Sequence, residues 1–255
     1  MKAKAGATLE ELGLADAPRA FPLAYPGAWP RESGLLAGDR MLPLDRLAHP
    51  DRTPVLCVGS NACPGQLRDK MATFGITAPV PMVRCRVTGL GVGVSAHVSR
   101  MGYVSAAPVR CPAAVRELVL LWLEAEQLAV IDASEGATLP DGNFVRVRLP
   151  VPDVRVELAD GTVLPEVFAY ANRRGVLHDG SGVPRDHPGQ RALLTELLLS
   201  SPALRRLLGN TPEEFCARAR ADAHRCVRGT LLFAREGWVT RSGLEHLFNG
   251  QGVPG

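Results

Sequence analysis

The chain has 255 residues, of which 46% are hydrophobic and 22% are charged, as in an ordinary globular protein. Its formal net charge of +3 gives no reason to expect nucleic acid or a membrane surface as a partner. The longest apolar run, Leu118–Leu123, is far too short to cross a bilayer, and the N-terminus lacks the apolar core of a secretory signal. We therefore expect a soluble, cytoplasmic protein, and its oligomeric state stays open.

Cysteine and histidine residues show no metal or disulfide pattern. No C-x-x-C pair occurs among the six cysteines, so scattered free thiols are expected. Cys57 falls inside an expected strand, which favours packing over a nucleophilic role. The histidines lack the spacing of metal ligands. We therefore expect no metal and no cofactor.

Residues 1–52 are expected to form an extension that packs on the main domain. Ala17–Pro30 is rich in proline, which predicts irregular structure, and it carries the aromatic residues Phe21, Tyr25 and Trp29 as candidate anchors. A mobile tail is the alternative. We also predict a helix within Leu35–Leu47.

The main domain, residues 53–255, begins with a strand, a turn and a helix. Val55–Val58 is short, apolar and rich in β-branched residues, as in a buried strand. Gly59-Ser60-Asn61 follows, and such a turn can point successive N–H groups at a carboxylate or phosphate. Gln66–Phe74 then predicts a helix. A plain tight connection is the simpler interpretation of this pattern.

Further strands and then helices follow along the chain. The pattern predicts an Asp-Gly hairpin turn at Ala159-Asp160-Gly161 and a capped helix beginning at Thr211. It also predicts a last short strand at Thr230–Phe233. The other expected strands are Val83–Val94, Gly102–Ala107, Val115–Leu123, Phe144–Pro150 and Val167–Ala171, and a helix is expected over His187–Leu199.

Glu135 is the titratable residue with the most functional interest. The segment Glu124–Ser134 predicts a short helix, and Gly136 stands where a helix usually ends. A carboxylic acid beside apolar surface can exchange protons near neutral pH. A solvated glutamate at a helix end is the alternative.

These segments together resemble the gamma-glutamylcyclotransferase family. Val55–Asn61 (VLCVGSN) is similar to its first strand and Y-G-S-N loop, and Glu126–Gly136 (EQLAVIDASEG) to its helix ending in Asp-x-x-Glu-Gly. Phe144–Val151 and Val167–Asn172 are similar to the strands that follow. The resemblance covers about residues 53–173 and leaves the first fifty residues and the helical C-terminal third outside it.

The resemblance implies an α+β fold with a closed mixed β-barrel, surrounding helices and a helical C-terminal region. It implies that Val58, Gly59, Ser60 and Asn61 bind substrate, with Phe144 close by, and that Glu135 is the general base and acid. The reaction would cyclise a gamma-glutamyl group to 5-oxoproline and release an amine, without a metal. The partner would be a small molecule with a gamma-glutamyl or similar amide group.

Two substitutions depart from the family pattern. Val58 replaces the usual Tyr of the loop, and Phe144 stands where a Tyr is common. Each change removes a hydroxyl group that could bond to substrate. Two alternatives therefore stay open: amide hydrolysis or acyl transfer on the same scaffold, and a ligand-binding barrel without turnover.

Overall fold

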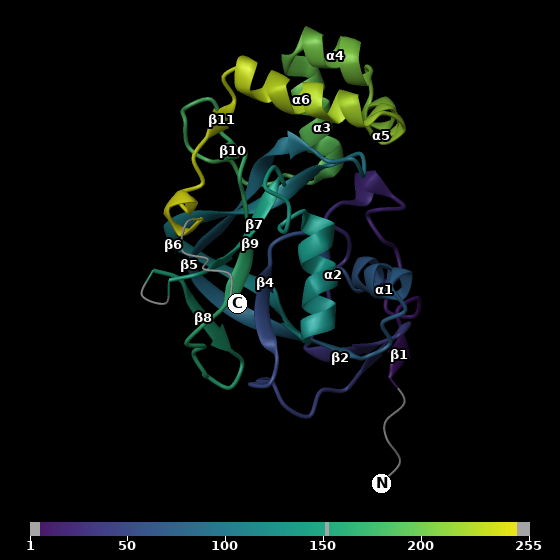
Figure 1. Cartoon of the computed structure of the whole chain (residues 1–255), viewed down its shortest axis with the longest axis vertical. Helices are drawn as coiled ribbons and strands as arrows, with labels where there is room; N and C mark the ends of the chain where they lie inside the picture. The colour runs from purple at the N-terminus through teal and green to yellow at the C-terminus, as the bar shows by residue number, and fades with distance from the viewer. Residues whose placement is uncertain (1–5, 151–152, 249–255) are drawn as a thin grey trace.

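The computed structural model describes residues 6–150 and 153–248, and it combines one large mixed sheet with six α-helices (Figure 1). The strands are β1 (Ala7–Thr8), β2 (Gly34–Ala37), β3 (Arg40–Leu42), β4 (Thr53–Cys57), β5 (Val80–Val98), β6 (Val104–Leu123), β7 (Phe144–Arg148), β8 (Arg155–Leu158), β9 (Phe168–Asn172), β10 (Val176–Leu177) and β11 (Val239–Thr240). The helices are α1 (Pro64–Thr73), α2 (Ala125–Glu135), α3 (Gln190–Ser200), α4 (Pro202–Leu208), α5 (Pro212–Ala221) and α6 (Ala223–Arg235).

A long hairpin of β5 and β6 forms the centre of the sheet. The expected strands Gly102–Ala107 and Val115–Leu123 belong to one strand, β6, which pairs with β5 from Val104 to Leu121. Both faces of β6 are buried along its apolar run Leu118–Leu123, because alternate residues enter two different cores. Leu121 packs in a core with α1 and α2, and Leu120 packs in a second core built mainly of strands.

The sheet is open, so the expectation of a closed barrel is wrong for the residues described. The hydrogen-bonded order is β1-β3-β2-β5-β6-β4-β9-β7, and its two ends do not pair with each other. The β4–β9 pair is parallel and the other pairs are antiparallel. Strand β5 offers its outer edge to β2, then β8, then β10 along its length, which leaves that edge unavailable to β7. The α+β class is confirmed.

Helices cover two regions of the sheet (Figure 1). Helices α1 and α2 pack against each other beside β4, whereas α3 to α6 form a cap over one end of the β5–β6 hairpin. The predicted start at Thr211 is confirmed, because its side chain accepts a hydrogen bond from the N–H of Glu214. The strand predicted at Thr230–Phe233 is wrong, because α6 starts at its cap Asp222 and continues through that segment.

The segment before β4 lies on the sheet. The helix predicted within Leu35–Leu47 is wrong, because β2 and β3 form a hairpin there and β2 pairs with β5. Tyr25 is buried and Trp29 is partly buried against the core, whereas Phe21 is 57% exposed. The division of the chain at residue 52 stays a prediction.

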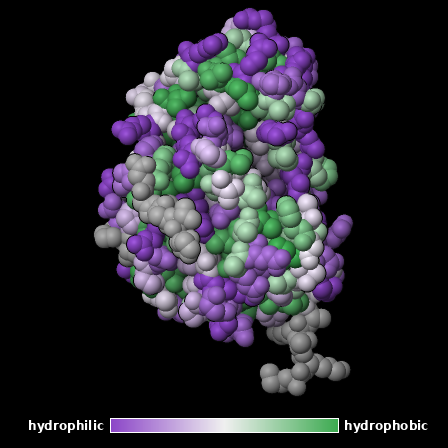
Figure 2. All heavy atoms as spheres, viewed as in Figure 1, coloured by the Kyte–Doolittle hydropathy of each residue, from purple (hydrophilic) through white to green (hydrophobic). Residues whose placement is uncertain are grey.

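Membrane-spanning helices are absent from the parts of the chain that the structure describes. None of the helices there has both the length and the apolar character that a bilayer span needs. In the space-filling view, polar and apolar side chains are interspersed over the visible face (Figure 2).

Candidate active site

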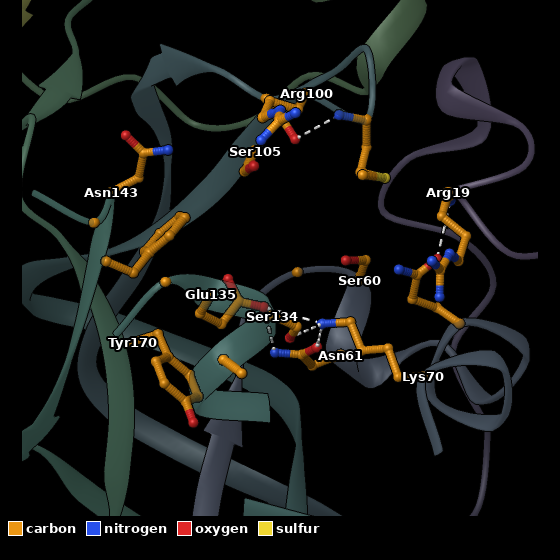
Figure 3. Close-up of a pocket in the computed structure, with 18 of the residues that line it drawn as sticks. Arg19, Ser60, Asn61, Lys70, Arg100, Ser105, Ser134, Glu135, Asn143 and Tyr170 are labelled. Carbon is orange, nitrogen blue, oxygen red and sulfur yellow. Dashed lines mark hydrogen bonds and ion pairs between the residues drawn. The ribbon is translucent and has the colours of Figure 1, made fainter. Parts of the chain in front are cut away.

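A cavity of about 570 Å³ opens where the β4–α1 loop, the end of α2 and the β5–β6 turn meet. The N-terminal segment adds part of its wall through Arg19 and Tyr25. All six residues expected at the site line this one cavity: Val58, Gly59, Ser60, Asn61, Glu135 and Phe144. The fold therefore brings together three segments that are far apart in the sequence (Figure 3).

Glu135 is the last residue of α2 and faces the loop after β4. Gly136 ends the helix in the left-handed conformation, with φ of 69°, as its position in the sequence predicted. The Glu135 side chain is only 18% exposed, and its Oε1 accepts a hydrogen bond of 3.1 Å from Asn61 Nδ2. Asn61 therefore connects the loop directly to the carboxylate (Figure 3).

Lys70 supplies the positive charge beside this carboxylate. Its ammonium group lies 3.2 Å from Glu135 Oε1 and also donates to Asn61 Oδ1 at 2.7 Å and to Ser134 Oγ at 2.8 Å. The C-terminal end of a helix is an unfavourable place for a negative charge. Lys70 offsets this, and its own side chain is 10% exposed.

Sequence reasoning missed Lys70. It lies one helical turn after Gln66, and both are buried on the inner side of α1. A buried lysine usually requires a paired carboxylate, and that partner is 65 residues away along the chain. The pattern of one helix therefore could not show which acid the lysine meets.

The loop Gly59–Asn61 is shaped by Tyr25. Gly59 has φ of −142°, so it is not needed for a left-handed turn. A Cβ atom at Gly59 would instead lie 2.3 Å from the Tyr25 hydroxyl, which accepts a 2.8 Å hydrogen bond from the N–H of Ala106. Burial raises the pKa of Tyr25 well above its usual range, so the hydroxyl keeps its proton.

The rest of the loop is a single 3-10 turn over Ser60–Ala62. Within it, the N–H of Ala62 donates to the carbonyl of Gly59 and the N–H of Cys63 donates to the carbonyl of Ser60. An anion at this loop would therefore have to use the N–H groups that precede Ala62.

The side chains of Val58 and Phe144 form apolar parts of the cavity wall. Val58 is 9% exposed and packs in the strand core with Leu56. Phe144 is 6% exposed and meets the ring of His97 edge-on, with ring centroids 5.3 Å apart. Neither side chain can offer a hydrogen bond to a ligand.

Tyr170 is held at the cavity by Asp132, one turn before Glu135. The Tyr170 hydroxyl donates to Asp132 Oδ1 at 2.7 Å, and burial raises its pKa. The Arg146 guanidinium also lies beside this carboxylate, with its Nε 3.4 Å from the same oxygen. These contacts fix the last turns of α2, and with them the direction of Glu135.

The cysteines do not provide a nucleophile here. All six are free, as expected. Cys57 is buried in β4, and burial raises its pKa, which disfavours the thiolate. Within residues 6–150 and 153–248, no three His, Cys, Asp or Glu side chains are grouped as metal ligands.

No protein-family model and no curated protein matches this sequence. Three solved structures are similar to part of the chain: a gamma-glutamyl cyclotransferase (14% identity, TM-score 0.35), an uncharacterised protein from Homo sapiens (15%, 0.35) and a protein from Arabidopsis thaliana (17%, 0.36). The matches cover 47%, 48% and 49% of this chain and 66%, 67% and 72% of those chains, respectively. At such identities and TM-scores the similarity is no evidence of a shared activity.

Proposed function

We propose that the protein cyclises a gamma-glutamyl group to 5-oxoproline and releases an amine, with Glu135 as the proton carrier. One observation carries the proposal: the largely buried carboxylate of Glu135 is held by Asn61 and Lys70, in the wall of a cavity beside the Gly59–Asn61 loop. The sequence resemblance supplies the reaction class, and this geometry supports it.

The proposed reaction uses the Glu135 carboxylate together with the amine and the side-chain carbonyl of the substrate. The ionised Glu135 accepts a proton from the substrate's α-ammonium group, and the resulting amine attacks the substrate's own side-chain carbonyl carbon. A C–N bond forms within the ring and leaves two hydrogens on the attacking nitrogen. Glu135 gives its proton to the leaving nitrogen as the bond to that nitrogen breaks, and the carboxylate then takes the second proton from the ring nitrogen. That proton passes to the released amine, so the products are 5-oxoproline with one ring N–H and an ammonium group. No external oxidant or reductant is required.

Negative charge would develop on the carbonyl oxygen during the attack. The N–H groups at the start of the Gly59–Asn61 loop are the donors assigned to that oxygen in this proposal. Lys70 and Asn61 hold the carboxylate in one orientation, so that its reorganisation during proton transfer is small.

The test is the substitution Glu135→Gln, which keeps the shape and removes the proton carrier. We expect 5-oxoproline release from a panel of gamma-glutamyl compounds to fall by about 10² to 10⁴-fold, measured by mass spectrometry. The matched control is Glu126→Gln, because Glu126 lies on the same helix but is exposed to solvent.

Undiminished turnover by a folded Glu135→Gln variant would remove this residue from the mechanism. The alternative, a ligand-binding pocket without catalysis, predicts binding of a panel compound with no product from either the wild type or the variant. Release of free glutamate instead of 5-oxoproline would favour the hydrolase alternative.

A further inference from the structure

The cavity has a second polar region, formed by His97 of β5 and Ser105 of β6, which the mechanism above does not use. Both residues line the cavity and both are buried, with exposed fractions of 3% and 7%. Ser105 lies across the cavity from Glu135, on the strand at the upper side of the view (Figure 3).

An irregularity in the hairpin places these two residues together. The register of β5 and β6 pairs Val94 with Ala106 and Val98 with Val104. Three residues of β5, including His97, therefore lie opposite the single residue Ser105 of β6. Bulges of this kind redirect a side chain, and here the ring of His97 enters the cavity wall.

The hydrogen bonds of His97 determine which ring nitrogen carries the proton. Asn172 Nδ2 lies 3.1 Å from His97 Nδ1, and the amide orientation is fixed because Asn172 Oδ1 accepts from the N–H of Arg174 at 2.7 Å. Asn172 therefore donates to Nδ1, which must be an acceptor, and the Ser95 hydroxyl, 2.9 Å from the same nitrogen, also donates to it. The proton of the neutral ring lies on Nε2.

The Nε2–H group has no partner among the described residues, although the ring is almost fully buried. Among the described residues, four have a side-chain nitrogen that is sealed from solvent and has no partner: Trp29, His49, Trp122 and Arg185. His97 is not among them, so its Nε2 is not sealed from solvent. The remaining access of Nε2 is through the cavity that His97 lines. The Ser105 hydroxyl is in the same situation, with no hydrogen bond from the described parts of the protein.

Burial also keeps the imidazole neutral. Desolvation, with a smaller contribution from the positive charge of Arg174, lowers the pKa of His97 to about 4. His97 thus presents one N–H donor at neutral pH, beside one hydroxyl donor.

We propose that His97 and Ser105 form a subsite that binds an acceptor oxygen on the leaving group of the substrate, a carbonyl or a carboxylate oxygen. This inference rests on the proposed function for the identity of the reacting end. Ser105 lies across the cavity from Glu135 (Figure 3), and His97 lies opposite Ser105 in the hairpin, so both donors are assigned to the part of the substrate beyond the scissile amide. A substrate with a purely aliphatic leaving amine would leave both donors without a partner inside the cavity.

Three probes of similar size test the subsite: gamma-glutamyl propylamide, gamma-glutamylglycinamide and gamma-glutamylglycine. Binding is measured by calorimetry on the Glu135→Gln protein, where turnover does not interfere, and 5-oxoproline release is measured on the wild type. We expect the two probes with an acceptor oxygen to bind about 3- to 10-fold more tightly than the propylamide. The comparison of glycinamide with glycine shows whether the acceptor is a carbonyl or a carboxylate.

Adding Ser105→Ala or His97→Phe should remove this preference and leave propylamide binding within about 2-fold. Ser105→Ala breaks no bond within the described protein, so it tests the subsite even where His97→Phe disturbs the fold. The control Ser200→Ala, at the exposed end of α3, should keep the preference.

Equal binding of the three probes, no binding of any of them, or an equal loss for all three in Ser105→Ala would overturn the subsite. A Ser105-dependent preference without any 5-oxoproline from the wild type would support the subsite and overturn the proposed function. Turnover that depends on Glu135 without any preference would overturn the subsite alone.

Discussion

Replacing Gly59 by Ala tests how the N-terminal segment shapes the loop. The new Cβ would lie 2.3 Å from the Tyr25 hydroxyl oxygen, which is far inside van der Waals contact. Either the loop or Tyr25 must move, and Tyr25 is held by the Ala106 N–H. Overpacking of this kind costs about 1–3 kcal/mol. For a chain of this size we therefore expect Tm to fall by about 2–12 °C.

A double-mutant cycle tests whether the Tyr25 hydroxyl causes the loss of stability in Gly59→Ala. Tyr25→Phe removes the hydroxyl and leaves the next ring atom 3.4 Å from the new Cβ, which is an ordinary contact. Tyr25→Phe alone costs about 1–3 kcal/mol, because the buried Ala106 N–H loses its acceptor. In the Tyr25→Phe background, Gly59→Ala should cost less, with a coupling of about 0.5–3 kcal/mol measured by urea denaturation.

Tyr103→Phe is the matched control for this cycle. Its ring stacks on Tyr25 at a centroid distance of 4.5 Å, and its hydroxyl is not among the atoms that a Cβ at Gly59 would meet. Gly59→Ala should lower the free energy of unfolding of the Tyr103→Phe protein by as much as it does in the wild type. Additive costs of Gly59→Ala and Tyr25→Phe, or a harmless Gly59→Ala, would refute the assignment of the loop shape to Tyr25.

Three further outcomes are expected. Lys70→Met leaves the Glu135 carboxylate buried without its cation and should lower the free energy of unfolding by about 3–5 kcal/mol, and adding Glu135→Gln should restore part of it. The pKa of His97 is 6.5 in the unfolded chain and about 4 in the folded protein, so its contribution to the free energy of unfolding should be fully present above pH 6.5 and fall by about 3 kcal/mol toward pH 4. In denaturation series at several pH values, His97→Phe should lack this slope. Removal of residues 1–40 takes away buried Tyr25 together with β2 and should cost more than about 3 kcal/mol, and an unchanged melting curve would contradict this.

Local chemistry in the sequence determined much of the secondary structure. Gly136 ends α2, Thr211 caps α5, and the Asp160-Gly161 turn closes a hairpin in which the N–H of Leu158 donates to the carbonyl of Thr162. Each of these features depends on residues within one or two turns of each other, so the sequence pattern is enough to predict it.

Segments with mixed patterns were decided by their tertiary neighbours. The run Thr230–Phe233 is short and mostly apolar, which suggested a strand, yet Cys226, Gly229 and Phe233 are buried at helical spacing within the cap. The sheet is open for a similar reason, because one edge of β5 is shared by three partners, which no single strand pattern reveals.

The residues of the candidate site also fall into two groups, those that local sequence motifs predicted and those that only the tertiary structure revealed. Short motifs in the sequence indicated Gly59–Asn61, Glu135 and Phe144, which all line one cavity. Lys70 was not predicted, and Tyr25 was predicted only as an anchor of the N-terminal segment, because Lys70 meets Glu135 across 65 residues and Tyr25 meets Ala106 across 81. The sequence by itself determined where the chain turns and which side chains can carry protons. Only the tertiary structure decided which charges and donors face each other, because those pairs form through long-range packing that leaves no local pattern.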